Sequence, residues 1–251
     1  MNQKIEEIKM RIRNITVIAG IYLRYAKRNP GFYFLQVVFL PMSILIPLLI
    51  LTQGLIVDLA VGSLICTQVV MTIQDVGDIV SSDKARKSRS FFITTPIKPT
   101  DYMIGIALAP LGYNVIGGAI LLAFCRFALG VSIEPTQLFG IVLVLGAAWF
   151  ISALVGFGIA EYGPRNWYHT GAICGIVSFF VTFLAPVYYP VERLPPILRF
   201  ASYFLYTANL GSIGRSIMMG TSVDIVSVGA LVCFLLLCLL IVIRGLNWRE
   251  L

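Results

Sequence analysis

Apolar runs that contain no charged residue and reach the thickness of a bilayer constrain this chain more than any other feature. The run from Gly31 to Val57 contains no Asp, Glu, Lys or Arg, whereas a core helix of a soluble domain rarely needs more than about 14 such residues. Hydrophobic residues make up 58% of the 251 residues and charged residues only 12%, which is about half the charged share of a soluble domain. The chain is therefore predicted to be an all-α integral membrane protein.

The apolar runs, divided by polar breaks, predict six transmembrane helices in one domain over residues 31–251. Spans of about 20 residues each use most of the chain. No room is left for a soluble catalytic domain. The predicted spans are residues 31–53, 58–78, 102–126, 137–160, 169–188 and 224–244.

The basic residues predict the orientation of these spans in the cell membrane. Positive charge gathers before the first span and between the second and the third, which places both termini in the cytoplasm. The formal net charge of +7 follows from this orientation, so nucleic acid is not expected as a partner. The basic residues concerned are Lys4, Lys9, Arg11, Arg13, Arg24, Lys27 and Arg28, followed by Lys84, Arg86, Lys87, Arg89 and Lys98.

Residues 1–30 predict an amphipathic helix that lies on the cytoplasmic surface of the membrane. Apolar side chains recur at alternating steps of three and four, with the basic residues largely elsewhere. Asn29 and Pro30 are expected to end the helix, because the residue before proline avoids the helical region. A short coiled coil or a soluble bundle helix is the less favoured alternative. The apolar stripe consists of Ile5, Ile8, Ile12, Ile15, Ala19, Tyr22 and Ala26.

Two connections have unusual composition. The cytoplasmic connection changes from polar and basic at residues 81–90 to apolar at residues 91–93, which fits either a short helix below the membrane or a solvated loop. The outer segment, at about residues 190–220, is too apolar for an ordinary loop and too interrupted to span. It predicts two re-entrant helices that dip into the outer leaflet.

No constellation of catalytic or metal-binding residues is present in the sequence. His169 is the only histidine, and the five cysteines lack the spacing of metal ligands, so neither a catalytic nor a metal site is predicted. The chain has no GxxxxGK[ST] loop, so no cofactor is expected to bind to it, and any ATP must act through another subunit. Span centres are nearly free of charge, which disfavours ion-coupled transport.

Polar uncharged side chains lie within two of the predicted spans. Gln68 and Thr72 lie on the second span, and Thr182 lies on the fifth span with Phe179 and Phe183. A pathway lined by weakly polar and aromatic groups suits an amphipathic substrate. Hydrogen bonding between helices explains the same residues equally well.

The order of these features resembles the permease subunit of type-2 ABC transporters over almost the whole chain. RYAKRNP at residues 24–30 looks like the amphipathic connecting helix of that family, and FFITTPIKPTDYMIG at residues 91–105 looks like its coupling-helix region. The outer segment APVYYPVERLPPILRFASYFLYTANL, residues 185–210, is similar to the family's re-entrant region.

This resemblance implies a half-transporter that exports an amphipathic substrate such as a drug, a lipid or a lipid-linked glycan. Two permease copies, expected to be a homodimer, would form the pathway within membrane lipid, and two copies of a separate ABC ATPase would bind ATP and Mg²⁺ below them. The expected coupling helix covers about residues 82–96, with Asp83, Arg86, Arg89, Ser90, Phe91, Phe92, Thr95 and Pro96 contacting the ATPase.

The resemblance also implies roles for residues at the pathway. Gln68, Thr72, Phe179, Thr182 and Phe183 are its candidate lining residues. The candidate outer gate consists of Tyr188, Tyr189, Pro190 and Leu194.

Two other classes of function remain as alternatives. The first is a membrane channel or scaffold that needs no ATPase, which no ring of charged residues supports. The second is a membrane-embedded enzyme, which the missing catalytic constellation disfavours. Neither the identity of the substrate nor the choice between a homodimer and a heterodimer follows from the sequence.

Overall fold

The computed structural model describes residues 2–28, 30–39, 42, 45–46, 56–88, 94–95, 97–164 and 166–245. Within these residues the regular elements are all helices, which confirms the prediction of an all-α chain. In chain order they are α1 (Asn2–Arg28), α2 (Pro30–Phe34), the π-helix η1 (Leu35–Phe39), α4 (Ile56–Ala85), α6 (Pro99–Phe127), α7 (Pro135–Tyr162), α8 (Trp167–Phe179), the π-helix η2 (Phe180–Leu184), the 3₁₀-helix η3 (Val191–Arg193), α9 (Pro196–Ser202), α10 (Tyr206–Met219) and α11 (Ile225–Gly245).

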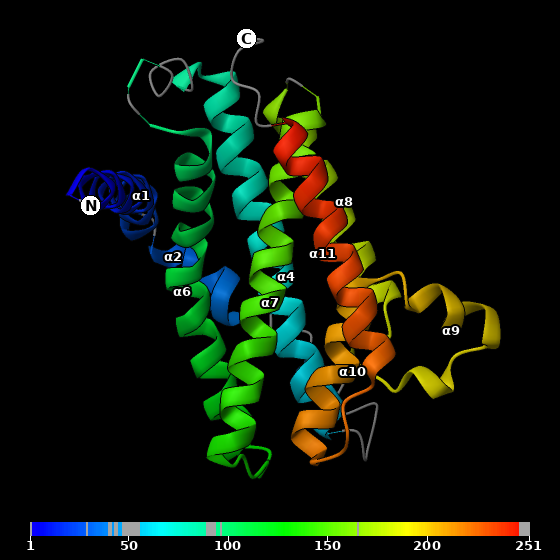
Figure 1. Ribbon diagram of the computed structural model, residues 1–251. Coiled ribbons are helices and arrows are strands. Elements are labelled where there is room, and N and C mark those ends of the chain that lie inside the picture. The colour runs from blue at the N-terminus through cyan, green and yellow to red at the C-terminus, as the bar shows by residue number, and fades with distance from the viewer. Residues whose placement is uncertain are drawn as a thin grey trace.

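Five segments of the described chain are long and apolar enough to cross a membrane: α4, α6, α7, α8 together with η2, and α11. They correspond to the second to sixth predicted spans. Most of the first predicted span, residues 31–53, lies outside the described residues. Figure 1 shows α4, α6, α7 and α11 side by side as upright helices of one bundle.

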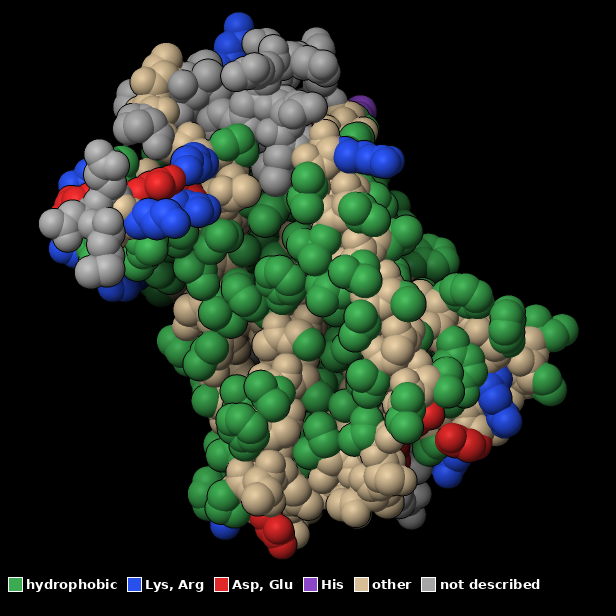
Figure 2. All heavy atoms as spheres, in the orientation of Figure 1, with side chains coloured by type: hydrophobic (Ala, Val, Ile, Leu, Met, Phe, Trp, Pro, Cys, Tyr) green, Lys and Arg blue, Asp and Glu red, His purple; other side chains and the backbone are tan. Residues whose placement is uncertain are grey.

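Helix α4 forms the centre of the bundle. In an apolar 18-residue stretch of α4, 89% of the residues are buried, because α6, α7, α8 and α10 all pack on this helix. The neighbouring helices also cover polar side chains of α4, such as Thr67, Gln68 and Thr72, which are buried. The corresponding stretch of α11 is only 17% buried, so α11 presents most of its apolar surface outward, as a helix in contact with lipid does. Figure 2 shows apolar side chains over the middle of one face of the bundle.

Small residues allow the helices to approach closely. A Cβ atom added at Gly156 of α7 would lie 2.7 Å from the backbone oxygen of Ile73 in α4. In α6, a Cβ at Gly105 would lie 2.7 Å from Cβ of Ile18 in α1. Gly105 and Gly156 therefore allow close helix packing. The partner of Gly105 belongs to the N-terminal helix and not to a span.

Helix α1 crosses the bundle near one end and packs mainly against α6. In Figure 1 it is viewed nearly along its own axis, while the other long helices stand upright. Ile18 is fully buried against α6, although the predicted apolar stripe omitted this residue. Ile8 and Ile12 belong to the predicted stripe but are 57% and 58% exposed. The helix therefore has one apolar surface that packs on the bundle and another that is exposed.

The outer segment contains η3, α9 and α10. Helix α9 projects from the side of the bundle (Figure 1), whereas α10 packs against α4, α7 and α11. Helix α10 ends at Gly220, whose φ of +66° is a left-handed conformation that glycine adopts without strain. The segment thus contains helices at the predicted positions, and its insertion into the outer leaflet stays a prediction.

Candidate functional site: the helix junction beside residues 86–98

The carboxylate of Asp83 joins three helices near the end of α4. It accepts hydrogen bonds from the hydroxyl of Tyr22 in α1 and, at 2.8 Å, from the hydroxyl of Tyr102 in α6. Asp83 and Tyr102 are buried, so these bonds form in a low-dielectric environment. Burial and the nearby charge of Asp83 raise the pKa of Tyr22 well above its ordinary value, which keeps its hydroxyl protonated as a donor.

A second contact joins α1 to the first turn of α6. Arg11 donates through Nε to Oδ1 of Asp101 at 2.9 Å, and its Nη2 lies 2.8 Å from the same oxygen. Asp101 is fully buried, while the side chain of Arg11 is 40% exposed. Arg11 also donates to the hydroxyl of Thr100 at 3.2 Å. Because an unpaired buried carboxylate is costly, this ion pair fixes α1 on the start of α6.

Two lysines make further contacts at the two ends of residues 86–98, Lys84 just before this connection and Lys98 at its last position. Nζ of Lys98 lies 2.7 Å from Oε1 of Glu7. This hydrogen bond and the positive charge of Lys98 lower the pKa of Glu7. Both side chains are more than half exposed, so the pair adds orientation more than stability. On the other side, Lys84 donates to the carbonyl oxygens of Ala160 at 3.3 Å and Glu161 at 2.7 Å. The negative end of the α7 dipole favours a cation at this position.

These contacts attach α1 to both ends of the connection between α4 and α6. Asp83 lies on the α4 side of that connection, and Asp101 and Tyr102 lie on the α6 side. Tyr22 of α1 reaches the α4 side through Asp83, and Arg11 of α1 reaches the α6 side through Asp101. A displacement of the connection would therefore be transmitted to α1, α4 and α6 together.

The predicted coupling helix is only partly within the described residues. Residues 82–85 continue α4 and do not begin a new helix, which corrects the predicted start of the coupling helix at residue 82. Arg86 is exposed in the turn that follows, and Thr95 is half-buried in a second turn. The remaining members of the predicted set lie outside the described residues: Arg89, Ser90, Phe91, Phe92 and Pro96.

The candidate pathway residues divide into a buried group and an exposed group. Gln68, Thr72 and Thr182 are buried. Gln68 Nε2 donates to Thr72 Oγ1 at 3.4 Å, and Thr182 Oγ1 donates to a backbone oxygen of its own helical segment. Phe179 and Phe183 are exposed and stack on each other with ring centroids 4.5 Å apart. The structure of one chain does not bring the five side chains together, so their shared role stays a prediction.

The candidate outer-gate residues lie next to the start of α4. Tyr188 is buried, and a Cβ added at Gly62 of α4 would lie 2.7 Å from its Cδ1. Its ring centroid is 5.9 Å from that of Phe183, so one gate candidate lies beside one pathway candidate. Tyr189, Pro190 and Leu194 are half-buried. Whether these residues act as a gate stays a prediction.

A buried ion pair between α4 and α10 was missed by the sequence analysis. Asp58 of α4 is 3% exposed and lies 3.5 Å from Nε of Arg215 in α10. Arg215 Nη1 also donates to the backbone oxygens of Pro186 and Val187, at 3.3 and 3.1 Å. Asp58 stands at the start of the second predicted span, and the structure buries it there. An acid and an arginine in otherwise apolar segments were the signal for this pair.

None of these groups is a metal site. Among the described residues, no cluster of three or more His, Cys, Asp or Glu side chains could hold a metal ion.

The comparison with protein families identifies the bundle. The family model for the ABC-2 type transporter matches residues 13–219, from α1 to the end of α10. The chain belongs to the ABC-2 type transporter family. A comparison with curated proteins found no match. As an ABC-2 type transporter protein with several apolar helices of spanning length, the chain is a multi-pass membrane protein that acts in transport. Membership also implies an ABC ATPase as the general kind of partner.

Proposed function

We propose that this chain is the permease subunit of an ATP-driven exporter, powered by a separate ATPase subunit that docks beside residues 86–98. The supporting observation is the attachment of α1 to both sides of that connection, through Asp83 and Asp101. A ligand or partner shifts a conformational equilibrium only by binding one state better than the other. Because α1, α4 and α6 are attached to one another at this connection, an ATPase that binds one state better would move these three helices together.

The proposed orientation places both termini and the 86–98 connection in the cytoplasm, with the chain in the cell membrane. Two features support it. The basic residues before α2 and after α4 follow the distribution expected at a cytoplasmic surface. In Figure 1, the turn after α4 and the C-terminal end of α11 lie at the same end of the bundle. ATP and Mg²⁺ would be held by two copies of the ATPase below this end.

The pathway is proposed to form between two copies of the chain. Phe179, Phe180 and Phe183 give α8 and η2 an exposed aromatic surface, which suits contact either with a second permease or with an amphipathic substrate between them. The substrate class proposed is a drug, a lipid or a lipid-linked glycan. A homodimer is the simplest assembly, because a two-fold interface needs only one self-complementary surface.

Purification from native membranes tests the ATPase partnership. The tagged chain, extracted in mild detergent, should carry an ATP-hydrolysing subunit in equal amount. Arg86→Glu should lower the substrate-stimulated part of that hydrolysis while the permease stays inserted. Arg13→Glu is a matched control, since Arg13 is an exposed arginine of α1. A chain that purifies alone, without ATPase activity, would instead support a channel or scaffold.

A further inference from the structure

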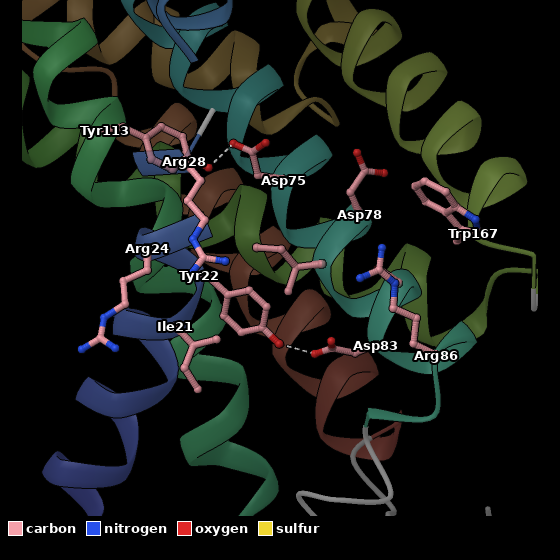
Figure 3. Close-up of a pocket in the computed structure, with 12 residues that line it drawn as sticks. Ile21, Tyr22, Arg24, Arg28, Asp75, Asp78, Asp83, Arg86, Tyr113 and Trp167 are labelled. Atoms are coloured by element: carbon pink, nitrogen blue, oxygen red, sulfur yellow. Dashed lines mark hydrogen bonds between the residues drawn. The ribbon is translucent and has the colours of Figure 1, made fainter. Parts of the chain in front are cut away.

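A cavity of about 550 Å³ lies between α1 and the last third of α4, and residues of α6 and α8 complete its wall. This volume falls within the range of small-molecule sites, about 300–1,000 Å³. Figure 3 shows Arg28 of α1, Asp78 of α4 and Arg86 after α4 around this space. The wall carries as many arginines as aspartates.

One carboxylate of this wall has no polar partner in the described part of the chain. Asp75 accepts a hydrogen bond from Tyr113, and Asp83 accepts one from Tyr22. The carboxylate of Asp78 accepts no hydrogen bond and forms no ion pair with any described residue, and it is exposed to the cavity. It points toward the same space as Trp167 (Figure 3). A carboxylate beside an indole ring is a favourable environment for an organic cation.

Two arginines supply the opposite charge. Arg28 at the end of α1 and Arg86 after α4 line the cavity and are exposed. Neither forms an ion pair with another residue that the structure describes. Figure 3 shows their guanidinium groups entering from two sides. Guanidinium groups bind phosphate oxygens in a bidentate manner. A ligand with only a negative charge would leave Asp78 unmatched, and a ligand with only a positive charge would leave the two arginines unmatched.

The position of the cavity indicates a ligand from the membrane. Helix α1 exposes Ile8 and Ile12, which are apolar and suited to the boundary between headgroups and acyl chains. The cavity lies beside α1, and therefore at the level of lipid headgroups.

We propose that this cavity binds a zwitterionic headgroup, a phosphate joined to an amine, carried by a phospholipid of the leaflet that contains α1. Asp78 and Trp167 hold the ammonium group, and Arg28 and Arg86 hold the phosphate. Binding requires neither the ATPase nor a second permease. The site can therefore be tested on the purified full chain, and its failure is separate from any failure of the exporter assignment.

The test is a titration of the detergent-purified chain with dihexanoyl phosphatidylethanolamine, followed by tryptophan fluorescence and by the unfolding temperature. Binding should saturate. Asp78→Asn and Arg86→Gln should each weaken it by about ten- to a hundredfold, the usual worth of a charged hydrogen bond. Glu6→Gln and Arg13→Gln are the matched controls, since these exposed α1 residues lie outside the cavity wall. The controls should leave the affinity unchanged.

Comparison probes separate the parts of the proposal. Dihexanoyl phosphatidylglycerol, which lacks the amine, should bind at least tenfold more weakly, and equal binding would overturn the role of Asp78. Free phosphoethanolamine bound as tightly as the lipid would support the headgroup chemistry and overturn the lipid source. Absence of saturable binding, or unchanged binding in Arg28→Gln and Arg86→Gln, would overturn the site. These two arginines are exposed, so the variants are expected to fold, which the unliganded unfolding temperature checks.

Discussion

Tyr22 donates a hydrogen bond to Asp83 across 61 positions of the sequence, and this contact attaches the N-terminal helix to the central helix of the bundle. The same carboxylate accepts the hydroxyl of Tyr102. Three helices therefore meet at one buried charge. Removal of either tyrosine hydroxyl leaves the carboxylate less well satisfied in a low-dielectric site.

Tyr22→Phe should lower the free energy of unfolding by about 1–2 kcal/mol, because a hydrogen bond to a charged group is lost while the ring still packs. Hydrogen exchange in α1 should become faster, since the helix is held less firmly on α4. Chemical unfolding in detergent and exchange mass spectrometry measure the two effects. Tyr168→Phe is the control, because Tyr168 is 69% exposed on α8. Equal effects of the two variants would show that the Asp83 contact does not hold α1.

The Arg11–Asp101 pair should respond unequally to removal of its two partners. Arg11→Gln leaves a fully buried carboxylate without its cation and should cost about 2–3 kcal/mol. Asp101→Asn leaves an arginine that is 40% exposed and can be hydrated, so it should cost about 1 kcal/mol. Unfolding of the two single variants and the double variant gives the coupling energy. A larger cost for Asp101→Asn would contradict the assignment of the buried charge.

The buried pair of Asp58 and Arg215 should hold the outer segment on α4. Arg215→Met should lower the free energy of unfolding by about 3–5 kcal/mol, because it leaves the Asp58 charge unpaired and removes the donor to Pro186 and Val187. The double variant Asp58→Asn with Arg215→Met should recover part of this loss. Hydrogen exchange should rise at residues 185–188 in the single variant. Exchange that rises uniformly over the bundle would contradict a local role.

Two glycines of α7 provide a test of helix packing. Gly156→Ala would place a Cβ 2.7 Å from a backbone oxygen of α4, so the two helices must separate, at a cost of about 1–3 kcal/mol. Gly158→Ala has nothing within 4 Å of the added atom, so it should be neutral or stabilise the helix by up to about 1 kcal/mol. Thermal unfolding of both variants checks the difference. Equal behaviour would show that close approach at Gly156 does not limit the packing.

The resemblance of its motifs to those of type-2 ABC permeases predicted the family, and the composition of the chain was enough to predict the membrane class and the five described spans. Their apolar runs are continuous and separated by polar or proline-rich breaks, and a bilayer imposes length on any helix that crosses it. The contacts of Asp83 and Asp101 were harder to predict from the sequence. The sequence analysis placed Asp83 in an exposed coupling segment, and the structure places it in the buried end of α4.

The helical class and the membrane class could be predicted from the sequence, because they depend on local composition and on the order of apolar segments, and the relation to ABC-2 type transporter proteins was predicted from the resemblance of motifs. Which polar residues meet is seen only in the folded chain. Tyr22 with Asp83, Arg11 with Asp101 and Asp58 with Arg215 are each far apart in the chain. Such pairs depend on which helix faces pack together, and apolar runs of similar hydrophobicity carry little information about those faces.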